Sequence, residues 1–349
     1  MRIKNTYVKI ALLFVLSIGM LVFFTNGNNS ATSKKEAKIG GVNFVSPGKK
    51  SSFSNFNGLQ RINAKWVAFN PYAFSKKGVP SVTFNHEHSW WGEQSNGVIE
   101  MLQQAKSEKL AVLLKPHVWV MGQGWCGDFD LDTEEKWKDW ENDYKNYILF
   151  YAKIAQKYNI EMLCIGTEYK IAATKRTIFF RSLIENIRTI YDGKVTYAAN
   201  WDNFHNIDFW DKLDYIGIDA YFPLANLKNA DKSALDLAWI KIEAELEAFS
   251  KKNNKPILFT EFGYKSTHFT AWNQWELDNI KDNEQINITA QNNAYTSLLE
   301  NCWNKDWFAG GFLWKWYPND ESTGGENNSD YTPQHKPVEK IISTYFKTK

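Results

Sequence analysis

The chain of 349 residues is poor in cysteine and contains only Cys126, Cys164 and Cys302. Their spacing matches no zinc site and no disulfide framework. Cys164 lies in an apolar, strand-like run and is predicted to be a core residue. The sequence does not decide whether Cys126 and Cys302 form a disulfide. Because the number of cysteines is odd, at least one thiol is expected to be free or to pair between chains.

An excess of charge of one sign is also missing. Lys and Arg number 41 and Asp and Glu 39, which leaves a net charge of +2, and no long basic run follows the N-terminus. This excludes the electrostatic footprint of a nucleic-acid-binding protein. The sequence also has no internal repeat and no low-complexity segment. With 44% hydrophobic and 23% charged residues, it is predicted to be globular with a sizeable core.

The N-terminus lacks an apolar run of the length typical of a membrane-spanning helix. The uncharged, mostly apolar run covers only residues 10–24, after Arg2, Lys4 and Lys9 and before a polar stretch. This order is typical of a signal peptide, and with no cysteine near the end of the run a lipid-modified N-terminal cysteine is excluded. We predict that residues 1–24 are a signal peptide or an N-terminal anchor that tethers the chain to a membrane through residues 10–24. The rest is expected to be exported: periplasmic, extracellular or anchored to the cell envelope.

Aromatic residues, in contrast, are abundant: 16 Trp, 16 Tyr and 23 Phe. One interpretation is a large core built from bulky side chains. Another is a cleft paved with aromatic rings, on which the C–H faces of sugars pack while polar neighbours bind their hydroxyl groups.

From residue 39 onward, short apolar runs alternate with helical patterns. The runs are rich in Val, Ile, Leu and Phe and alternate only weakly, which is typical of strands buried on both faces. Predicted strands cover residues 40–45, 65–70, 111–119, 162–168, 194–200, 215–221, 256–261 and 311–316. Predicted helices cover residues 54–62, 96–108, 133–158, 174–191, 233–253, 284–303 and 336–346. This order indicates an α/β fold, a single (β/α)8 TIM barrel over residues 39–349, joined to the N-terminal segment by a linker over residues 25–38.

Active sites of this fold lie at the C-terminal ends of the strands, and two carboxylates occur there. Glu168 closes the fourth predicted strand and Glu261 the seventh. A Glu at the end of a buried strand destabilises the fold unless its carboxylate has a partner, and such a residue is often kept for a function. A buried ion pair with Lys115 is one explanation, but two such Glu residues at one barrel mouth favour function.

Hydrolysis of a glycosidic bond uses such a pair of groups. One carboxylic acid protonates the leaving oxygen, and the other carboxylate attacks or stabilises the anomeric carbon. Strands four and seven lie across an eight-stranded barrel, so their end residues can face each other over a gap the size of a sugar. The residues alone do not say which Glu has which role.

These motifs, in this order, resemble the clan A retaining glycoside hydrolases and, more closely, glycoside hydrolase family 113, known mainly for β-1,4-mannanase activity. The resemblance covers the barrel and rests on Leu114-Lys115-Pro116-His117, Ile165-Gly166-Thr167-Glu168, Phe259-Thr260-Glu261-Phe262-Gly263-Tyr264 and Gly310-Gly311-Phe312-Leu313-Trp314. It implies that Glu168 is the acid/base and Glu261 the nucleophile. It also implies that Tyr221 orients Glu261 and that Trp314 forms a sugar platform.

Further polar and aromatic residues at the strand ends are candidates for binding the substrate: His117, Trp119, Asn200, Trp201 and Trp316. Rim packing is the alternative for these side chains. Many members of the wider clan carry Asn just before the acid/base, where it binds the sugar 2-hydroxyl. This chain has Thr167 there, as the resemblance to family 113 implies, and Asn200 is our candidate for that contact.

No metal or other cofactor is predicted. Asp128, Asp130 and Asp132 alternate like the start of a calcium loop, but Thr133 occupies the position where that motif needs Gly. A solvated loop before a helix is the preferred interpretation. His86 and His88 lack an evident third ligand, and we interpret their segment as a wall of the cleft.

Taken together, these features predict an exported, monomeric, retaining hydrolase of β-1,4-linked mannan or another mannose-containing polysaccharide. Two alternatives keep the barrel but change the function. The first is hydrolysis of another β-glycan, such as a glucan, a xylan or a polymer of amino sugars. The second is a barrel without catalytic activity that binds carbohydrate or serves as a scaffold in the cell envelope. Neither the sugar nor the choice between endo and exo action follows from the sequence.

Overall fold

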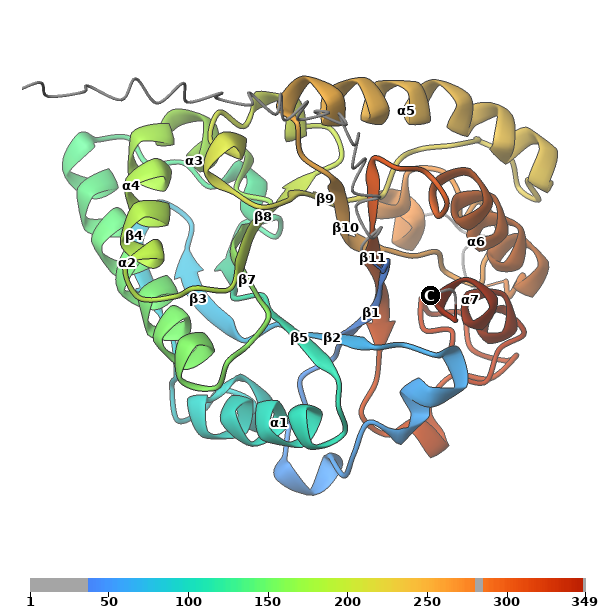
Figure 1. Cartoon of the computed structure of the whole chain (residues 1–349), viewed down its shortest axis with the longest axis horizontal. Helices are drawn as coiled ribbons and strands as arrows, with labels where there is room; N and C mark the ends of the chain where they lie inside the picture. The colour runs from blue at the N-terminus through green and yellow to red at the C-terminus, as the bar shows by residue number, and fades with distance from the viewer. Residues whose placement is uncertain (1–36, 280–284, 348–349) are drawn as a thin grey trace, which may run out of the picture. The chain divides into compact units, whose positions relative to one another are not determined.

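The computed structural model describes residues 37–279 and 285–347. At its centre is a closed parallel barrel with the strand order β1-β11-β10-β9-β8-β7-β5-β2 (Figure 1). Its strands are β1 (Ile39–Phe44), β2 (Trp66–Phe69), β5 (Ala111–Leu114), β7 (Met162–Thr167), β8 (Lys194–Asn200), β9 (Ile216–Asp219), β10 (Ile257–Phe262) and β11 (Phe308–Trp316). Each barrel strand overlaps one of the eight strands predicted from the sequence, which confirms the (β/α)8 barrel. The predicted signal peptide or anchor and most of the predicted linker lie outside the described residues.

Helices surround the barrel (Figure 1). They are α1 (Ser95–Ser107), α2 (Glu134–Lys157), α3 (Lys170–Lys175), α4 (Thr177–Arg188), α5 (Lys232–Asn253), α6 (Ile288–Cys302) and α7 (Val338–Phe346). The predicted helix over residues 174–191 was wrong at its start, because Arg176 has non-helical backbone angles and separates α3 from α4. Its guanidinium group reaches Glu134 and Glu141 of α2. The weak candidate over residues 54–62 is a 3-10 helix, η2 (Asn57–Ile62).

The aromatic stripe of α2 is a packing face, as its helical spacing predicts. Trp137, Trp140, Tyr144 and Tyr151 are all buried. The helix is capped by Thr133, whose side chain accepts a hydrogen bond from the backbone N–H of Lys136 at 3.2 Å. The long helix therefore takes part of the aromatic content of the chain into the core.

The predicted strand over residues 111–119 is in fact two strands in two sheets. Proline has no N–H for a strand ladder, and Pro116 ends the barrel strand β5. After it, β6 (His117–Met121) pairs with β3 (Tyr72–Lys76), and β3 pairs with β4 (Val79–Thr83) in a separate three-stranded sheet. The second sheet was not predicted. It carries Tyr72 and Trp119 to the mouth of the barrel.

The core has two layers. A large cluster lies between strands and helices, and a smaller one fills the barrel interior with Ile39, Ala68, Leu113, Met162, Cys164, Ala198, Tyr215, Leu258 and Phe312. The barrel is therefore packed. All three cysteines are buried and free, so Cys126 and Cys302 do not form a disulfide in this structure.

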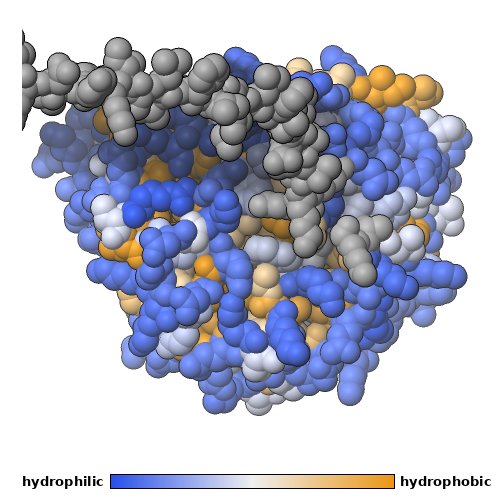
Figure 2. Space-filling view, viewed as in Figure 1, coloured by the Kyte–Doolittle hydropathy of each residue, from blue (hydrophilic) through white to orange (hydrophobic). Residues whose placement is uncertain are grey.

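In the part of the chain that the structure describes, no helix is both long enough and apolar enough to cross a membrane. The face seen in Figure 2 is largely hydrophilic, with hydrophobic residues exposed over α5. That helix carries the exposed side chains of Leu237 and Ile240.

Candidate active site

Glu168 is held at a sharp turn directly after β7. Its φ of 52° lies in the left-handed region, which residues other than glycine rarely adopt. The backbone N–H of Glu168 donates to the carbonyl of Ala198 on β8 at 2.8 Å, and the N–H of Lys170 donates to the carbonyl of Glu168 at 2.7 Å. These bonds fix the turn between strand and helix. Unusual backbone angles concentrate at functional sites, where the surrounding structure holds them in place.

Glu261 reaches the barrel interior because β10 is irregular at its end. Leu258 and Thr260 face the interior, so strict alternation would turn Glu261 outward. The register of β10 shifts between Phe259 and Glu261 against β9, and a bulge of this kind redirects a side chain. Glu261 is therefore inside, with 7% of its surface exposed. Two residues after Glu261, position 263 has to be glycine, since a Cβ there would lie 2.4 Å from the carbonyl oxygen of Trp314.

The Glu261 carboxylate has two partners, one for each oxygen. The buried ammonium group of Lys115 donates to Oε1, and the hydroxyl of Tyr221 donates to Oε2 at 2.7 Å. Lys115 also lies 3.6 Å from Oδ1 of buried Asp219. Burial by itself lowers the pKa of Lys115, but the two carboxylates outweigh burial and hold that pKa above its ordinary value. The lysine is thus a fixed positive charge beneath Glu261, and the expected ion pair with Lys115 exists as part of the site.

Glu168 has different surroundings. Among the described residues, its carboxyl group bonds to the indole N–H of Trp125, at 2.7 Å from Oε2. Burial, followed by repulsion from Glu261, raises the pKa of Glu168 to about 7, although the Trp125 bond and the charge of Lys115 act in the opposite direction. Burial and then repulsion from Glu261 also raise the pKa of Asp219 well above its ordinary value. The site therefore combines a carboxylate bound to a cation with a carboxyl group that keeps its proton near neutral pH.

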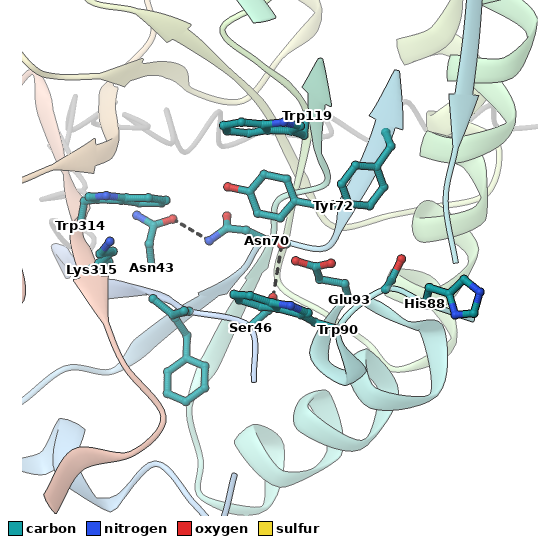
Figure 3. Close-up of a pocket in the computed structure, with 14 residues that line it drawn as sticks. Asn43, Ser46, Asn70, Tyr72, His88, Trp90, Glu93, Trp119, Trp314 and Lys315 are labelled. Atoms are coloured by element: carbon teal, nitrogen blue, oxygen red, sulfur yellow. Dashed lines mark hydrogen bonds between the residues drawn. The ribbon is translucent and has the colours of Figure 1, made fainter. Parts of the chain in front are cut away.

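Two cavities open at this end of the barrel. The first, which we call the Glu168 cavity, has a volume of about 540 Å3 and is lined by Trp125, Glu168, Asn200, Trp201, Asp202, Tyr221, Gln274, Trp275 and Tyr331. The second, the Trp314 cavity, has a volume of about 480 Å3, and its lining includes Asn43, Asn70, Tyr72, Trp90, Glu93, Trp119 and Trp314 (Figure 3). Both volumes are in the range of cavities that hold small ligands.

Most of the predicted binding residues line one of these cavities. In the Glu168 cavity, Trp201 stacks on Trp275 with ring centres 5.6 Å apart, and the Asn200 side chain donates to Asp202 at 3.0 Å. Trp119 and Trp314 line the other cavity, and Trp119 is 51% exposed. The predicted residues that line a cavity thus form two groups, one in each cavity.

His117 and Trp316 are not on the wall of either cavity. The His117 ring stacks on Tyr72 at 4.9 Å, and burial followed by repulsion from Lys115 lowers the pKa of His117 to about 3. His117 is therefore a neutral support for Tyr72.

The prediction that Trp316 binds the substrate was wrong. The register between β1 and β11 skips Lys315, so Trp316 does not follow Trp314 to the interior. Trp316 is 2% exposed and packs in the outer core with the Arg61 guanidinium over its ring.

Sequence reasoning missed several residues of the site: Tyr72, Trp90, Glu93, Trp125 and Trp275. They come from the second sheet, from loops and from short 3-10 helices, where no end of a barrel strand marks them. The available signal was the number of tryptophans in segments without helical or strand periodicity.

Across residues 37–279 and 285–347, no group of three or more His, Cys, Asp or Glu side chains is arranged to hold a metal ion. In the aspartate-rich loop, Asp130 pairs with Lys175 and Asp132 with Lys136. These ion pairs fit a solvated loop ahead of α2.

Comparisons with known proteins agree with this geometry. The model of glycoside hydrolase family 113 matches residues 46–336. A solved complex of a family 113 β-1,4-mannanase is 27% identical to this chain, with a TM-score of 0.76 and coverage of 90% of this chain and 100% of the other. The family 113 β-mannanase of Alicyclobacillus acidocaldarius, solved with ManMIm, is 22% identical, with a TM-score of 0.76 and coverage of 89% and 97%.

More distant structures share the fold alone. A β-glucuronidase of Faecalibacterium prausnitzii is 13% identical with a TM-score of 0.55, over 89% of this chain and 49% of that one. No curated protein sequence is significantly similar. The family match spans most of the chain and both carboxylates. The chain belongs to glycoside hydrolase family 113 and is an enzyme that hydrolyses O-glycosidic bonds.

Proposed function

We propose that this enzyme cleaves β-1,4-linked mannan, or another mannose-containing polysaccharide, with retention of configuration at the anomeric carbon. Support for the substrate comes from the family 113 structure that is 27% identical to this chain, which is a β-1,4-mannanase. The observation that carries the mechanism is the unequal environment of the two carboxyl groups. Glu261 is buried and bonds to Lys115 and Tyr221, whereas Glu168 is half-buried and bonds to Trp125.

In the first step, a carboxylate oxygen of Glu261 attacks the anomeric carbon as the bond to the glycosidic oxygen breaks. Contacts with Lys115 and Tyr221 hold both oxygens of the carboxylate in place for this attack. Glu168 has a pKa of about 7 and donates its proton to the departing oxygen. This step frees one part of the chain and leaves the other as an ester on Glu261.

In the second step, the ionised Glu168 takes a proton from water, whose oxygen attacks the anomeric carbon and releases Glu261. Repulsion by Glu261 is one cause of the raised pKa of Glu168. Because the ester on Glu261 carries no charge, that pKa falls in the intermediate and Glu168 changes from an acid to a base. Two successive inversions at the anomeric carbon result in retention.

The test is a panel of insoluble and soluble glycans with reducing-end release as the readout. The parent enzyme is expected to act on linear β-1,4-mannan, and the folded Glu261→Gln variant is expected to show no turnover. Release from a glucan, a xylan or chitosan but not from mannan would move the assignment to another β-glycan. If the parent binds glycans without turning any over, the barrel is a binding protein.

We also propose that the enzyme acts outside the cytoplasm. The support is the pattern of residues 1–24, with positive residues ahead of a short apolar run. Fractionation of cells that express the full chain, followed by N-terminal sequencing, tests this proposal. A full-length chain recovered only from the cytoplasm would contradict it.

A further inference from the structure

A second buried carboxyl group lies away from the reacting pair. Glu93 ends the short 3-10 helix η3 (Trp91–Glu93), lines the Trp314 cavity and is only 8% exposed. Within the described residues it has no salt bridge, and its carboxyl group bonds only to the backbone of Trp90. Burial raises the pKa of Glu93 to about 7. A buried carboxyl group without a cation destabilises the fold, so its position in a cavity calls for a ligand.

The segment that carries Glu93 is firmly held. The backbone N–H groups of Trp91 and Gly92 donate to the carbonyls of Gly48 and Pro47, at 3.2 Å and 2.9 Å. The Gln94 side chain donates to the carbonyl of Ser89 at 2.8 Å. Glu93 is therefore presented to the cavity by a fixed turn.

The surroundings of Glu93 are those of a sugar site. Trp90 and Trp119 are 54% and 51% exposed, although both are large apolar side chains. Figure 3 shows the Glu93 carboxyl group near Tyr72 and Trp90, with Trp119 on the far side of Tyr72. Asn70 is buried, and its side-chain oxygen has no hydrogen-bond partner among the described residues. Exposed indoles beside unsatisfied polar groups suit a ring with apolar faces and hydroxyl edges.

Tyr72 links this group to the reacting centre. Burial, then the charge of Glu261 and, more weakly, that of Glu93 raise the pKa of Tyr72 above its ordinary value. Tyr72 therefore lies within electrostatic reach of both carboxyl groups. The cavity continues to Trp314, whose strand pairs with β1 at Asn43. The Trp314 cavity therefore brings together Glu93 and Tyr72, which is within electrostatic reach of the nucleophile.

The direction of the substrate across the two cavities follows from the roles of the two reacting groups and so rests on the proposed function. Glu168 protonates the leaving oxygen, and it lines the Glu168 cavity with Trp125. The departing part of the substrate therefore occupies the Glu168 cavity. The part that becomes attached to Glu261 extends into the Trp314 cavity.

We propose that Glu93 determines specificity for substrate length by accepting hydrogen bonds from hydroxyl groups of a sugar ring beyond the one that reacts. Trp90 and Trp119 provide the faces against which that ring and its neighbour pack. A carboxyl group has two oxygens, and hydroxyl donors stabilise its ionised form, so Glu93 can hold two hydroxyl groups of one ring.

The test compares two substrates, an aryl β-mannoside with one sugar ring and mannohexaose. The variants are Glu93→Gln, which keeps the shape of the side chain, and Glu100→Gln as a control at an exposed carboxylate on α1, away from both cavities. For Glu93→Gln, the loss of kcat/KM on mannohexaose is expected to exceed the loss on the aryl mannoside by about 10- to 100-fold, the size of a charge-assisted hydrogen bond. Glu100→Gln is expected to match the parent on both substrates.

Equal losses on both substrates, or no loss on mannohexaose, would overturn the role of Glu93. Thermal melting identifies a variant that fails to fold. If Glu93→Gln does not fold, Glu93→Asp takes its place in the same comparison. Its shorter side chain keeps the carboxyl group but moves it away from the sugar. If the parent turns over neither mannoside, the proposed function fails, and the role of Glu93 is judged by calorimetry. Titration of oligosaccharides from the glycan panel into the parent and into Glu93→Gln is then expected to show weaker binding to the variant, and equal or absent binding to both contradicts the role.

Discussion

The hydrogen bond from Trp125 to Glu168 makes a quantitative prediction about pH. The indole N–H donates to the carboxylate and so stabilises its ionised form, which lowers the pKa of Glu168. In a Trp125→Phe variant the ring remains but the donor is lost. The protonated acid therefore persists to higher pH, and the alkaline limb of the activity profile is expected to move upward.

The size of the shift follows from the strength of one such bond. A hydrogen bond to a charged group contributes about 1.5 kcal/mol at the low end of its usual range, and one pKa unit corresponds to about 1.4 kcal/mol. The limb is therefore expected to move by on the order of one pH unit. In the parent, with the pKa of Glu168 at about 7, kcat/KM falls about tenfold per unit above that pH.

The assay is the pH dependence of kcat/KM on a manno-oligosaccharide, whose poor leaving group needs the proton. Trp275→Phe is the matched control, because Trp275 lines the same cavity but stacks on Trp201. It is expected to leave the alkaline limb in place. If the alkaline limb of Trp125→Phe lies at the same pH as that of the parent, or at a lower pH, the reasoning is wrong. The limb would then not report the titration of Glu168 stabilised by the Trp125 hydrogen bond.

Other contacts make independent predictions. Lys115→Met removes the cation between Glu261 and Asp219 and is expected to lower the free energy of unfolding, measured in urea, by about 3–5 kcal/mol. The control Lys170→Met removes a cation from a salt bridge whose side chains are 38% and 32% exposed, and is expected to change this free energy by less than about 1 kcal/mol. Equal effects of the two substitutions would contradict the buried cluster. Tyr221→Phe removes one donor to the nucleophile and is expected to lower kcat/KM by about 10- to 100-fold, with little change in melting temperature. A thiol reagent is expected to find no reactive cysteine in the native protein and three after denaturation without reductant, and fewer than three would indicate a disulfide.

The barrel and the positions of Glu168 and Glu261 at its mouth were predictable because both depend on buried strands. An apolar run that ends abruptly at a Glu, as at Glu168 and Glu261, marks a strand end at the mouth of this fold. Within the run over residues 111–119, Pro116 already indicated a break, because proline cannot donate a hydrogen bond to a strand ladder. The split at this proline places Lys115 under Glu261 and moves Trp119 to a second sheet.

Two kinds of feature were beyond sequence patterns. Irregular register decides which way a side chain points, as for Glu261 on β10 and Trp316 on β11, and alternation gives the opposite answer at both. Residues of loops and short 3-10 helices, such as Trp125 and Glu93, join the site through contacts between distant segments, and no local periodicity marks them. Their roles depend on packing that only the folded chain provides.

The most direct test of the central claim is to trap the covalent intermediate. A 2-deoxy-2-fluoro mannosyl fluoride slows both steps but keeps a good leaving group, so the glycosyl-enzyme accumulates and its position can be found by peptide mass spectrometry. The predicted result is one sugar per chain, on the peptide that contains Glu261. A sugar on Glu168 or elsewhere, or no adduct together with an inverted product from an enzyme that turns over the aryl mannoside, would contradict the assignment of Glu261 as nucleophile and Glu168 as acid.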